Sequence, residues 1–252
     1  MDDRAIGAIG DVARGELNFS WFRSAFRRDH GAKGALDFGH AVIGTTDDLD
    51  QYLHSYGPMI RSQWERISHL LAAVEPPTTV FDYGCGQGLA GLLANDLTRG
   101  RLFGQARDIV LVEPSSLALA RAVALYARLA PDARVTAINR RFDEVDKEQV
   151  PATSPGATLH LFSNSLDLPG FDALTLLIAT VRAGRHTILS VSHDRDFNGG
   201  SPQIAALAAT MTQAGKDGHL IDCRSTVERF TCDNPSRSAG IGWLCEFEVK
   251  DG

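Results

Sequence analysis

Short β-branched runs alternate with longer helical runs throughout the chain after residue 77. The strand-like runs cover residues 78–83, 108–113, 133–139, 157–164 and 185–192. The helix-like runs cover residues 88–98, 115–129, 171–183 and 201–215, and a short acidic helix is expected near 143–149. Alternation on this scale predicts a parallel sheet with helices on both of its faces.

The end of the chain breaks this alternation. Two strand-like runs, residues 219–232 and 242–250, are joined by a loop that contains no helix. Strands connected in this way pair antiparallel, because a parallel pair needs a long crossover. The predicted fold class is therefore α/β: a doubly wound, mostly parallel seven-stranded sheet that ends in an antiparallel hairpin.

The first 75 residues follow a different pattern. Helix-like runs cover residues 16–28 and 47–74, with a glycine-studded stretch between them, and the breakers EPPTT at 75–79 follow. A chain of 252 residues with 44% hydrophobic content fits one α/β core with an attachment better than two domains. We expect residues 1–75 to form a helical extension or lid on a Rossmann-like domain, residues 76–252.

The net charge and the cysteines indicate which kinds of partner and which cellular compartment the sequence favours. The formal net charge is −6, and this disfavours nucleic acid, because phosphate-binding proteins usually present a basic face. The four cysteines are widely spaced without a CxxC pair, which argues against a metal site and favours reduced thiols. The charged amino terminus is unlike a signal peptide, and no apolar run reaches the ~18 residues of a membrane span. The sequence predicts a cytoplasmic protein without a membrane segment.

Three alternating glycines follow the first predicted strand of the sheet. The stretch DYGCGQG runs from Asp82 to Gly88, and an apolar helix-like run comes directly after it. Glycine permits positive φ and lets a ligand lie against the backbone, and the start of the next helix offers free amide donors. The second strand ends at Glu113, whose carboxylate could accept hydrogen bonds from both hydroxyls of a ribose. This pattern predicts a site for a cofactor that contains a nucleoside.

The motif resembles the first motif of the class I S-adenosylmethionine-dependent methyltransferases, and Glu113 in LVEPS is similar to their second. The resemblance covers residues 76–252 and includes the closing hairpin. A dinucleotide fingerprint would instead need glycine at position 89, where this chain has Leu89. The resemblance implies S-adenosylmethionine as cofactor, held by residues at four strand ends: Asp82, Gly84, Cys85, Gly86, Gly88, Glu113, Pro114, Ser115, Arg141, Phe142, Ser163 and Asn164.

The resemblance also implies distinct roles for these residues. Asp82 would hold the methionine end of the cofactor, and Pro114 and Ser115 would flank the adenine. The usual acidic residue near the adenine amine is replaced here by Arg141, so the adenine is expected to rest against Phe142.

Two candidates for catalysis lie where strands end. His193 follows the fifth strand and is either a general base with a near-neutral pKa or a solvated loop residue. Asn164 either orients the acceptor or serves as a turn residue. The stretch LFSNSLDLPG lacks the Asn/Asp-Pro-Pro-aromatic element of enzymes that methylate bases or glutamine.

The amino-terminal region offers further side chains without a decided role. Tyr52, Tyr56 and Gln63, with Trp64 offset, lie near one face of a predicted helix that would either cover the cofactor or pack on the sheet. Aromatic residues at 21, 22 and 26 fit an acceptor pocket or a core equally well, and Arg27 and Arg28 are expected on a solvated face. Two hypotheses therefore remain: a methyltransferase acting on a small molecule or a protein, or a non-catalytic relative that binds the cofactor or a protein partner.

Overall fold

The computed structural model describes residues 2–39, 41–141, 144–166, 172–195, 200–233 and 238–250. Seven strands form one sheet: β1 (Thr79–Tyr83), β2 (Asp108–Val112), β3 (Arg134–Ile138), β4 (Thr158–Ser163), β5 (Gly184–His193), β6 (Ile221–Thr231) and β7 (Ala239–Val249). Their order across the sheet is β3-β2-β1-β4-β5-β7-β6. Strands β1 to β5 are parallel, and β7 runs antiparallel to both β5 and β6. The predicted fold class is confirmed.

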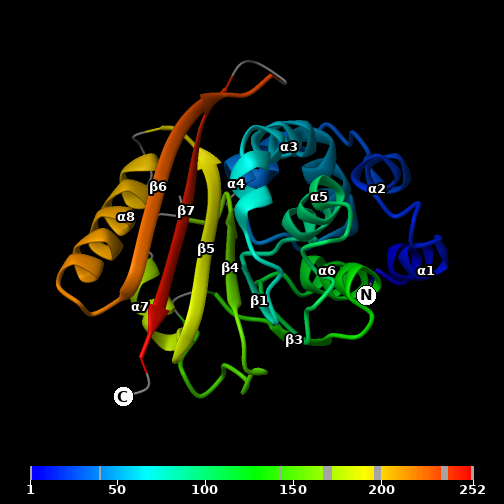
Figure 1. Ribbon diagram of the computed structural model, residues 1–252. Coiled ribbons are helices and arrows are strands. Elements are labelled where there is room, and N and C mark those ends of the chain that lie inside the picture. Colours follow the sequence, from blue (N-terminus) through cyan, green and yellow to red (C-terminus); the bar gives the residue numbers. More distant parts are fainter. Residues whose placement is uncertain are drawn as a thin grey trace.

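Helices cover both faces of the sheet (Figure 1). They are α1 (Asp3–Asp11), α2 (Phe19–Phe26), the 3-10 helix η1 (Lys33–Gly39), α3 (Thr46–Arg66), α4 (Ser68–Ala73), α5 (Leu89–Thr98), α6 (Ser116–Leu129), α7 (Ala173–Thr180) and α8 (Gly200–Lys216). Helices α7 and α8 pack on one face, and α1 to α6 lie on the other. Within the described residues, no helix combines the length and the apolar character needed to cross a bilayer.

The central strands are hydrophobic on both sides because both faces are covered. All residues of β1 and β2 are buried, as expected for strands inside a doubly wound sheet. The helix after β2 begins where the sequence predicts, since the Ser115 hydroxyl accepts a hydrogen bond from the Ala118 amide and caps it.

Two expectations about helices are wrong. The expected helix near 143–149 is absent from residues 145–150, which form turns. Its two buried apolar residues, Val145 and Val150, are five positions apart, a spacing that does not place them on one helical face. The expected single helix over 47–74 is divided into α3 and α4 at Ile67, which has φ −94° and ψ 13°.

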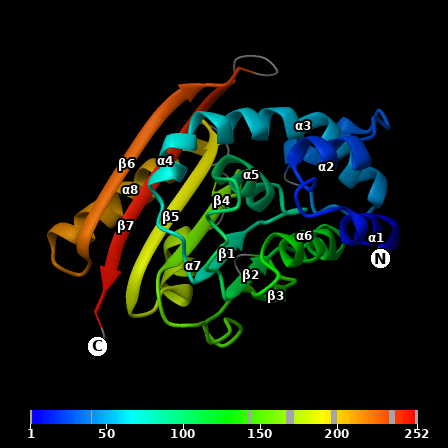
Figure 2. The same cartoon turned by 45° about the vertical axis from the view of Figure 1, so that its right-hand side comes forward.

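Helix α3 lies along the edge of the sheet at which the parallel strands end (Figure 2). It begins with Thr45, whose side chain accepts a hydrogen bond from the Asp48 amide. Pro58 lies inside the helix and has no N–H for the usual bond to the carbonyl four residues earlier. Helix α1, which the sequence did not predict, packs against α6, and α2 packs against α3 and α5.

A chain of polar contacts crosses the buried face under α7. The Tyr83 hydroxyl lies 2.9 Å from His160 Nδ1 and 2.8 Å from Thr180 Oγ1. His160 Nε2 lies 3.0 Å from His186 Nδ1, and His186 Nε2 lies 2.7 Å from the Arg182 carbonyl oxygen. That carbonyl can only accept, so His186 must donate from Nε2. Burial lowers the pKa of His160 well below its ordinary value and also lowers the pKa of His186.

The substitution His160→Gln should therefore cost a pH-dependent amount of stability. At about pH 7.5 we expect a loss of about 1–3 kcal/mol from broken buried hydrogen bonds. Below about pH 6.5, unfolded wild type binds a proton at His160 that the folded protein excludes, so wild type loses stability. The difference between the two proteins should then shrink by up to about 1.4 kcal/mol per pH unit.

Urea unfolding between neutral and mildly acidic pH measures this difference. Tyr83→Phe is the matched control, because it removes the hydroxyl bonded to His160 and leaves both imidazoles in place. Its cost should stay nearly constant over the same pH range. A difference between wild type and His160→Gln that does not change with pH would contradict the assignment of a neutral buried imidazole.

Candidate active site

The glycine loop connects β1 to α5 at the carboxyl edge of the sheet. The backbone amides of Gly84 and Cys85 both donate to the carbonyl oxygen of Val112, at 2.8 and 3.2 Å. The loop is therefore fixed to the end of the neighbouring strand β2. Gly84, Gly86 and Gly88 all have positive φ, at 66°, 51° and 86°, which explains why glycine is needed at each alternate position.

The surroundings of these glycines differ. A Cβ on Gly88 would lie 2.8 Å from Leu125 Cδ2 and 3.3 Å from Ala122 Cα, so this glycine allows α5 to approach α6 closely. A Cβ on Gly86 would meet no atom within 4 Å. Gly86 therefore has open space beside its backbone, whereas Gly88 also has a packing role that the resemblance did not imply.

Asp82 is the buried acid before the loop, with 1% of its surface exposed. Its Oδ2 accepts a hydrogen bond of 2.7 Å from the Tyr126 hydroxyl, and its Oδ1 is buried without a hydrogen-bond partner among the described residues. Burial raises the pKa of Asp82 to about 7, against the lowering effect of Tyr126, and the nearby Glu113 raises it further. A buried oxygen without a partner is unusual and marks a place for a donor that is not part of the chain.

Gly91 is required for this contact, and the sequence analysis did not single it out. A Cβ at Gly91 would overlap the phenol ring of Tyr126, the ring that carries the hydroxyl bonded to Asp82. The only signal in the sequence is the spacing of Gly88 and Gly91, which places both on the face of α5 that packs against α6.

Glu113 follows β2 and turns toward the glycine loop. Its Oε2 accepts a hydrogen bond from the Gly86 amide at 3.1 Å, and its Oε1 accepts one from the Ser115 amide at 2.9 Å. Burial raises the pKa of Glu113, while these two amides lower it. The Asn139 side chain holds the turn by donating to the carbonyl oxygens of Glu113 and Pro114, at 2.9 and 2.8 Å. Loop and carboxylate therefore meet at Gly86.

The end of β4 is held by α3. Trp64 Nε1 donates to Ser163 Oγ at 3.1 Å. The side-chain amides of Gln63 and Asn164 pair reciprocally, at 3.1 and 2.8 Å. Asn164 has φ 53°, a left-handed conformation that asparagine tolerates better than most residues. Gln63 and Trp64 were expected to cover the cofactor or pack on the sheet, and they contact the two strand-end residues directly.

The amino-terminal part of α3 contacts the glycine loop, and the segment before it contacts the start of α6. Gln87 Nε2 donates to the Leu49 carbonyl oxygen at 3.3 Å, and Ser115 Oγ donates to the Ile43 carbonyl oxygen at 2.6 Å. Ser115 thus serves both as a helix cap and as an attachment point for the amino-terminal residues. These contacts place residues 43–49 beside the site.

The other predicted site residues lie in the same region or outside the described part. His193 is the last residue of β5, pairs with Gly240 and is partly buried. By strand alternation it lies on the same face as Leu189 and Val191, the face covered by α3 to α6. Arg141 is exposed in the turn after β3, and Phe142 lies outside the described residues.

Cys85 has a buried thiol within the glycine loop. Burial raises the pKa of this thiol well above its ordinary value, and the nearby Asp82 and Glu113 raise it further. The side chain is therefore a protonated, apolar part of the loop, and only its backbone is available to a ligand.

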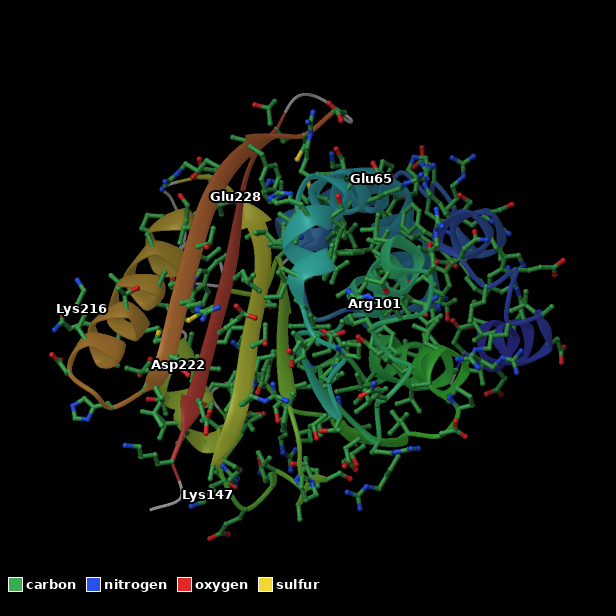
Figure 3. The ribbon with its side chains drawn as sticks, in the orientation of Figure 1. Glu65, Arg101, Lys147, Lys216, Asp222 and Glu228 are labelled. Atoms are coloured by element: carbon green, nitrogen blue, oxygen red, sulfur yellow. The ribbon has the colours of Figure 1, made fainter. Side chains whose placement is uncertain are left out.

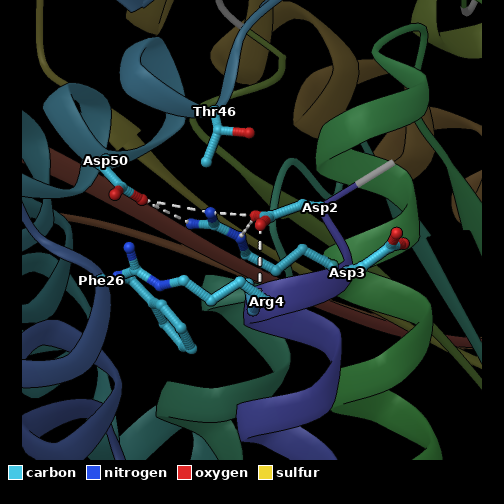
Figure 4. Close-up of a pocket in the computed structure, with 8 residues that line it drawn as sticks. Asp2, Asp3, Arg4, Phe26, Thr46 and Asp50 are labelled. Carbon is cyan, nitrogen blue, oxygen red and sulfur yellow. Dashed lines mark hydrogen bonds and ion pairs between the residues drawn. The ribbon is translucent and has the colours of Figure 1, made fainter.

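A buried arginine joins three segments beside the loop. Arg121 on α6 is 0% exposed. Its guanidinium is ion-paired with Asp2 and with Asp50, the latter at 3.1 Å, and Nη1 donates to Gln87 Oε1 at 2.8 Å. Asp2 and Asp50 approach from opposite sides (Figure 4). The sequence analysis missed this cluster, because its members are far apart along the chain.

No protein-family model matches the sequence, and no curated protein matches it. Solved structures similar to this chain include three methyltransferases. The O-methyltransferase TomG from Streptomyces achromogenes, solved with SAM, is 14% identical, with a TM-score of 0.47 over 94% of this chain and 99% of its own. The plantazolicin methyltransferase BpumL, solved with SAH, is 12% identical, with a TM-score of 0.43 over 98% and 100%. A proposed RNA methyltransferase from Pyrococcus horikoshii is 10% identical, with a TM-score of 0.43 over 94% and 98%.

The fold follows from the chain's own topology, in which β3-β2-β1-β4-β5 has the order of a nucleotide-binding sheet. Strand β7 is then inserted antiparallel between β5 and β6, which is the closing hairpin that the resemblance implied. This is the doubly wound, mostly parallel seven-stranded sheet that the sequence predicts.

Proposed function

We propose that this protein is an S-adenosylmethionine-dependent methyltransferase acting on a small-molecule or protein acceptor. The observation that carries the proposal is the surroundings of Gly86. Its left-handed backbone borders open space, and its amide is bonded to the acid at the end of β2. A nucleoside needs this combination, since the bare backbone accommodates its approach and the carboxylate binds its sugar hydroxyls.

The residues of the site suit this cofactor. Glu113 would bind the ribose, exchanging its bond to the Gly86 amide for bonds from the sugar hydroxyls. Asp82 Oδ1, which lacks a partner among the described residues, would accept a hydrogen bond from the ammonium group of the methionine end or from a water bound to it. Such a partner favours the ionised carboxylate and should lower the pKa of Asp82 from its value of about 7.

When bound, the cofactor supplies a methyl group activated by a sulfonium. The chain then has to orient the acceptor nucleophile in line and, for some acceptors, remove its proton. His193 at the end of β5 is our candidate for proton removal. Asn164 is the candidate for orientation, because its pairing with Gln63 fixes the direction of its amide.

A non-catalytic relative of the same fold is the second candidate. The observation that favours it is that Trp64 and Gln63 bind Ser163 and Asn164. Helix α3 therefore lies where we would expect an acceptor to bind. This protein would bind the nucleoside, or a protein partner, without transferring a methyl group.

Two measurements test and separate these proposals. Titration calorimetry with S-adenosylmethionine and with S-adenosylhomocysteine should show binding of one equivalent of each. Release of S-adenosylhomocysteine during a screen of small-molecule and protein acceptors is expected for the enzyme and not for the non-catalytic relative. If neither nucleoside binds at tenfold above cellular concentration, the cofactor assignment is wrong.

A further inference from the structure

An arginine-rich pocket lies on the outer side of α2 and α3. It has a volume of about 440 Å³ and is lined by Phe19, Ser20, Arg23, Ser24, Arg27, Arg28 and Arg61. Pockets of several hundred Å³ are the size that small ligands occupy. Four of its seven lining residues are arginines, in a chain whose formal net charge is −6.

The positive charge of the pocket is only partly compensated, by the carboxylates of Asp96 near Arg61 and Asp50 near Arg28. Arg61 is ion-paired with Glu65 at 2.7 Å, and Glu65 is marked beside α3 in Figure 3. Within the described part of the chain, Arg23, Arg27 and Arg28 form no ion pair. The Nε of Arg23 is buried and has no hydrogen-bond partner in the part of the chain that the structure describes. Burial lowers the pKa of Arg23, and the neighbouring charges of Arg27 and Arg61 lower it further.

Helical spacing directs these groups to one side. Ser20, Arg23, Ser24 and Arg27 follow the i, i+3, i+4, i+7 pattern, so they share one face of α2 and its direct continuation. The adjoining face carries Phe19, Phe22 and Phe26, which are buried, and Phe19 also lines the pocket. A polar helix face in contact with solvent normally carries both acidic and basic side chains. The polar face of α2 and its continuation carries only arginine and serine.

The pocket is separate from the proposed methyl-transfer site. Arg61 and Gln63 are two positions apart on α3 and therefore point in nearly opposite directions. Gln63 contacts Asn164 at the edge of the sheet, while Arg61 lies over the Phe19 ring, 5.7 Å from its centroid. A ligand in the pocket would thus contact α2 and α3 without entering the space beside Gly86.

We propose that this pocket binds a small phosphorylated ligand through one phosphate or diphosphate group. Guanidinium groups bind phosphate oxygens by paired hydrogen bonds, and several of them together match a multiply charged anion. The serine hydroxyls supply further donors on the same face. A concave pocket of this size on an acidic protein favours a small ligand over a nucleic-acid backbone, which needs an extended basic surface.

The test is titration calorimetry of the full-length protein with inorganic pyrophosphate at low and at moderate salt. Wild type should bind one equivalent, more weakly at the higher salt concentration. Arg23→Gln should weaken binding about tenfold or more. Arg107→Gln removes the same charge from an exposed position before β2 and should change the affinity less than about twofold.

The following results would overturn the proposal or separate it from the cofactor site. Absence of pyrophosphate binding by wild type, or equal losses in the two variants, would overturn it. Tighter binding of a short single-stranded RNA than of pyrophosphate, lost in Arg23→Gln, would replace the small ligand with nucleic acid. Arg23→Gln should bind S-adenosylhomocysteine as wild type does, so failure of the anion site and failure of the cofactor site are distinguishable.

Discussion

The Gly86→Val variant should fold and lose at least about a hundredfold in affinity for S-adenosylhomocysteine, equivalent to about 2.7 kcal/mol. A Cβ at this position meets no protein atom within 4 Å, so the branched side chain would project into the space assigned to the nucleoside. It would also separate that space from the Glu113 carboxylate, which lies against the same residue's amide. Titration calorimetry measures the affinity, and thermal unfolding measures the stability.

Gly218→Val is the matched control for backbone strain. Gly218 also has a positive φ, 77°, and open space around its Cβ direction, but it lies in the turn between α8 and β6. Both variants should lose about 1–2 kcal/mol of stability from the left-handed conformation, and only Gly86→Val should lose binding. Retained affinity in Gly86→Val would show that the cofactor does not lie against the loop.

Replacing Arg121 with methionine should destabilise the fold by about 3–5 kcal/mol, because it leaves buried carboxylates without their cation. Asp2 and Asp50 both pair with this guanidinium. Burial already raises the pKa of Asp50 despite the opposing effect of Arg121, so its carboxylate should protonate more readily in the variant. Urea unfolding at neutral pH measures the loss.

Two further variants show whether the stability lost in Arg121→Met comes from the unpaired buried charges. Arg185→Met breaks an exposed ion pair of 2.8 Å with Glu75 and should cost less than about 1 kcal/mol. Adding Asp50→Asn to Arg121→Met should restore part of the stability, because it removes one of the unpaired charges. A cost for Arg121→Met no greater than that of Arg185→Met would mean that the buried cluster does not stabilise the amino-terminal segment.

The elements built from local patterns could be predicted from the sequence. The alternation of strand-like and helix-like runs was sufficient to predict the parallel sheet, because it depends on periodicity. The short connection between the last two strand-like runs was sufficient to predict the antiparallel hairpin. The start of the helix after β2 was also predicted, because the Ser115 cap depends only on neighbouring residues. The meeting of Gly86 and Glu113 follows from parallel strands that end at one edge.

Features that depend on contacts distant in sequence could not be predicted. Arg121 lies within an apolar helical run, and nothing local indicates that Asp2 and Asp50 neutralise it. Helix α1 was missed because its glycines weaken the helical pattern, while its stability comes from packing on α6. The roles of His193 and Asn164 remain predictions, since chemistry depends on an acceptor that the sequence does not identify.

For the proposed methyltransferase, the proline inside α3 has a consequence for turnover. Leu49, before Pro58, contacts the glycine loop through Gln87, whereas Gln63, after it, holds Asn164. Because Pro58 cannot donate to the helical hydrogen-bond ladder between them, we expect the part of α3 after Pro58 to tilt more readily than the part before it. An acceptor could then enter and leave beside Asn164 while the nucleoside stays bound at the glycine loop.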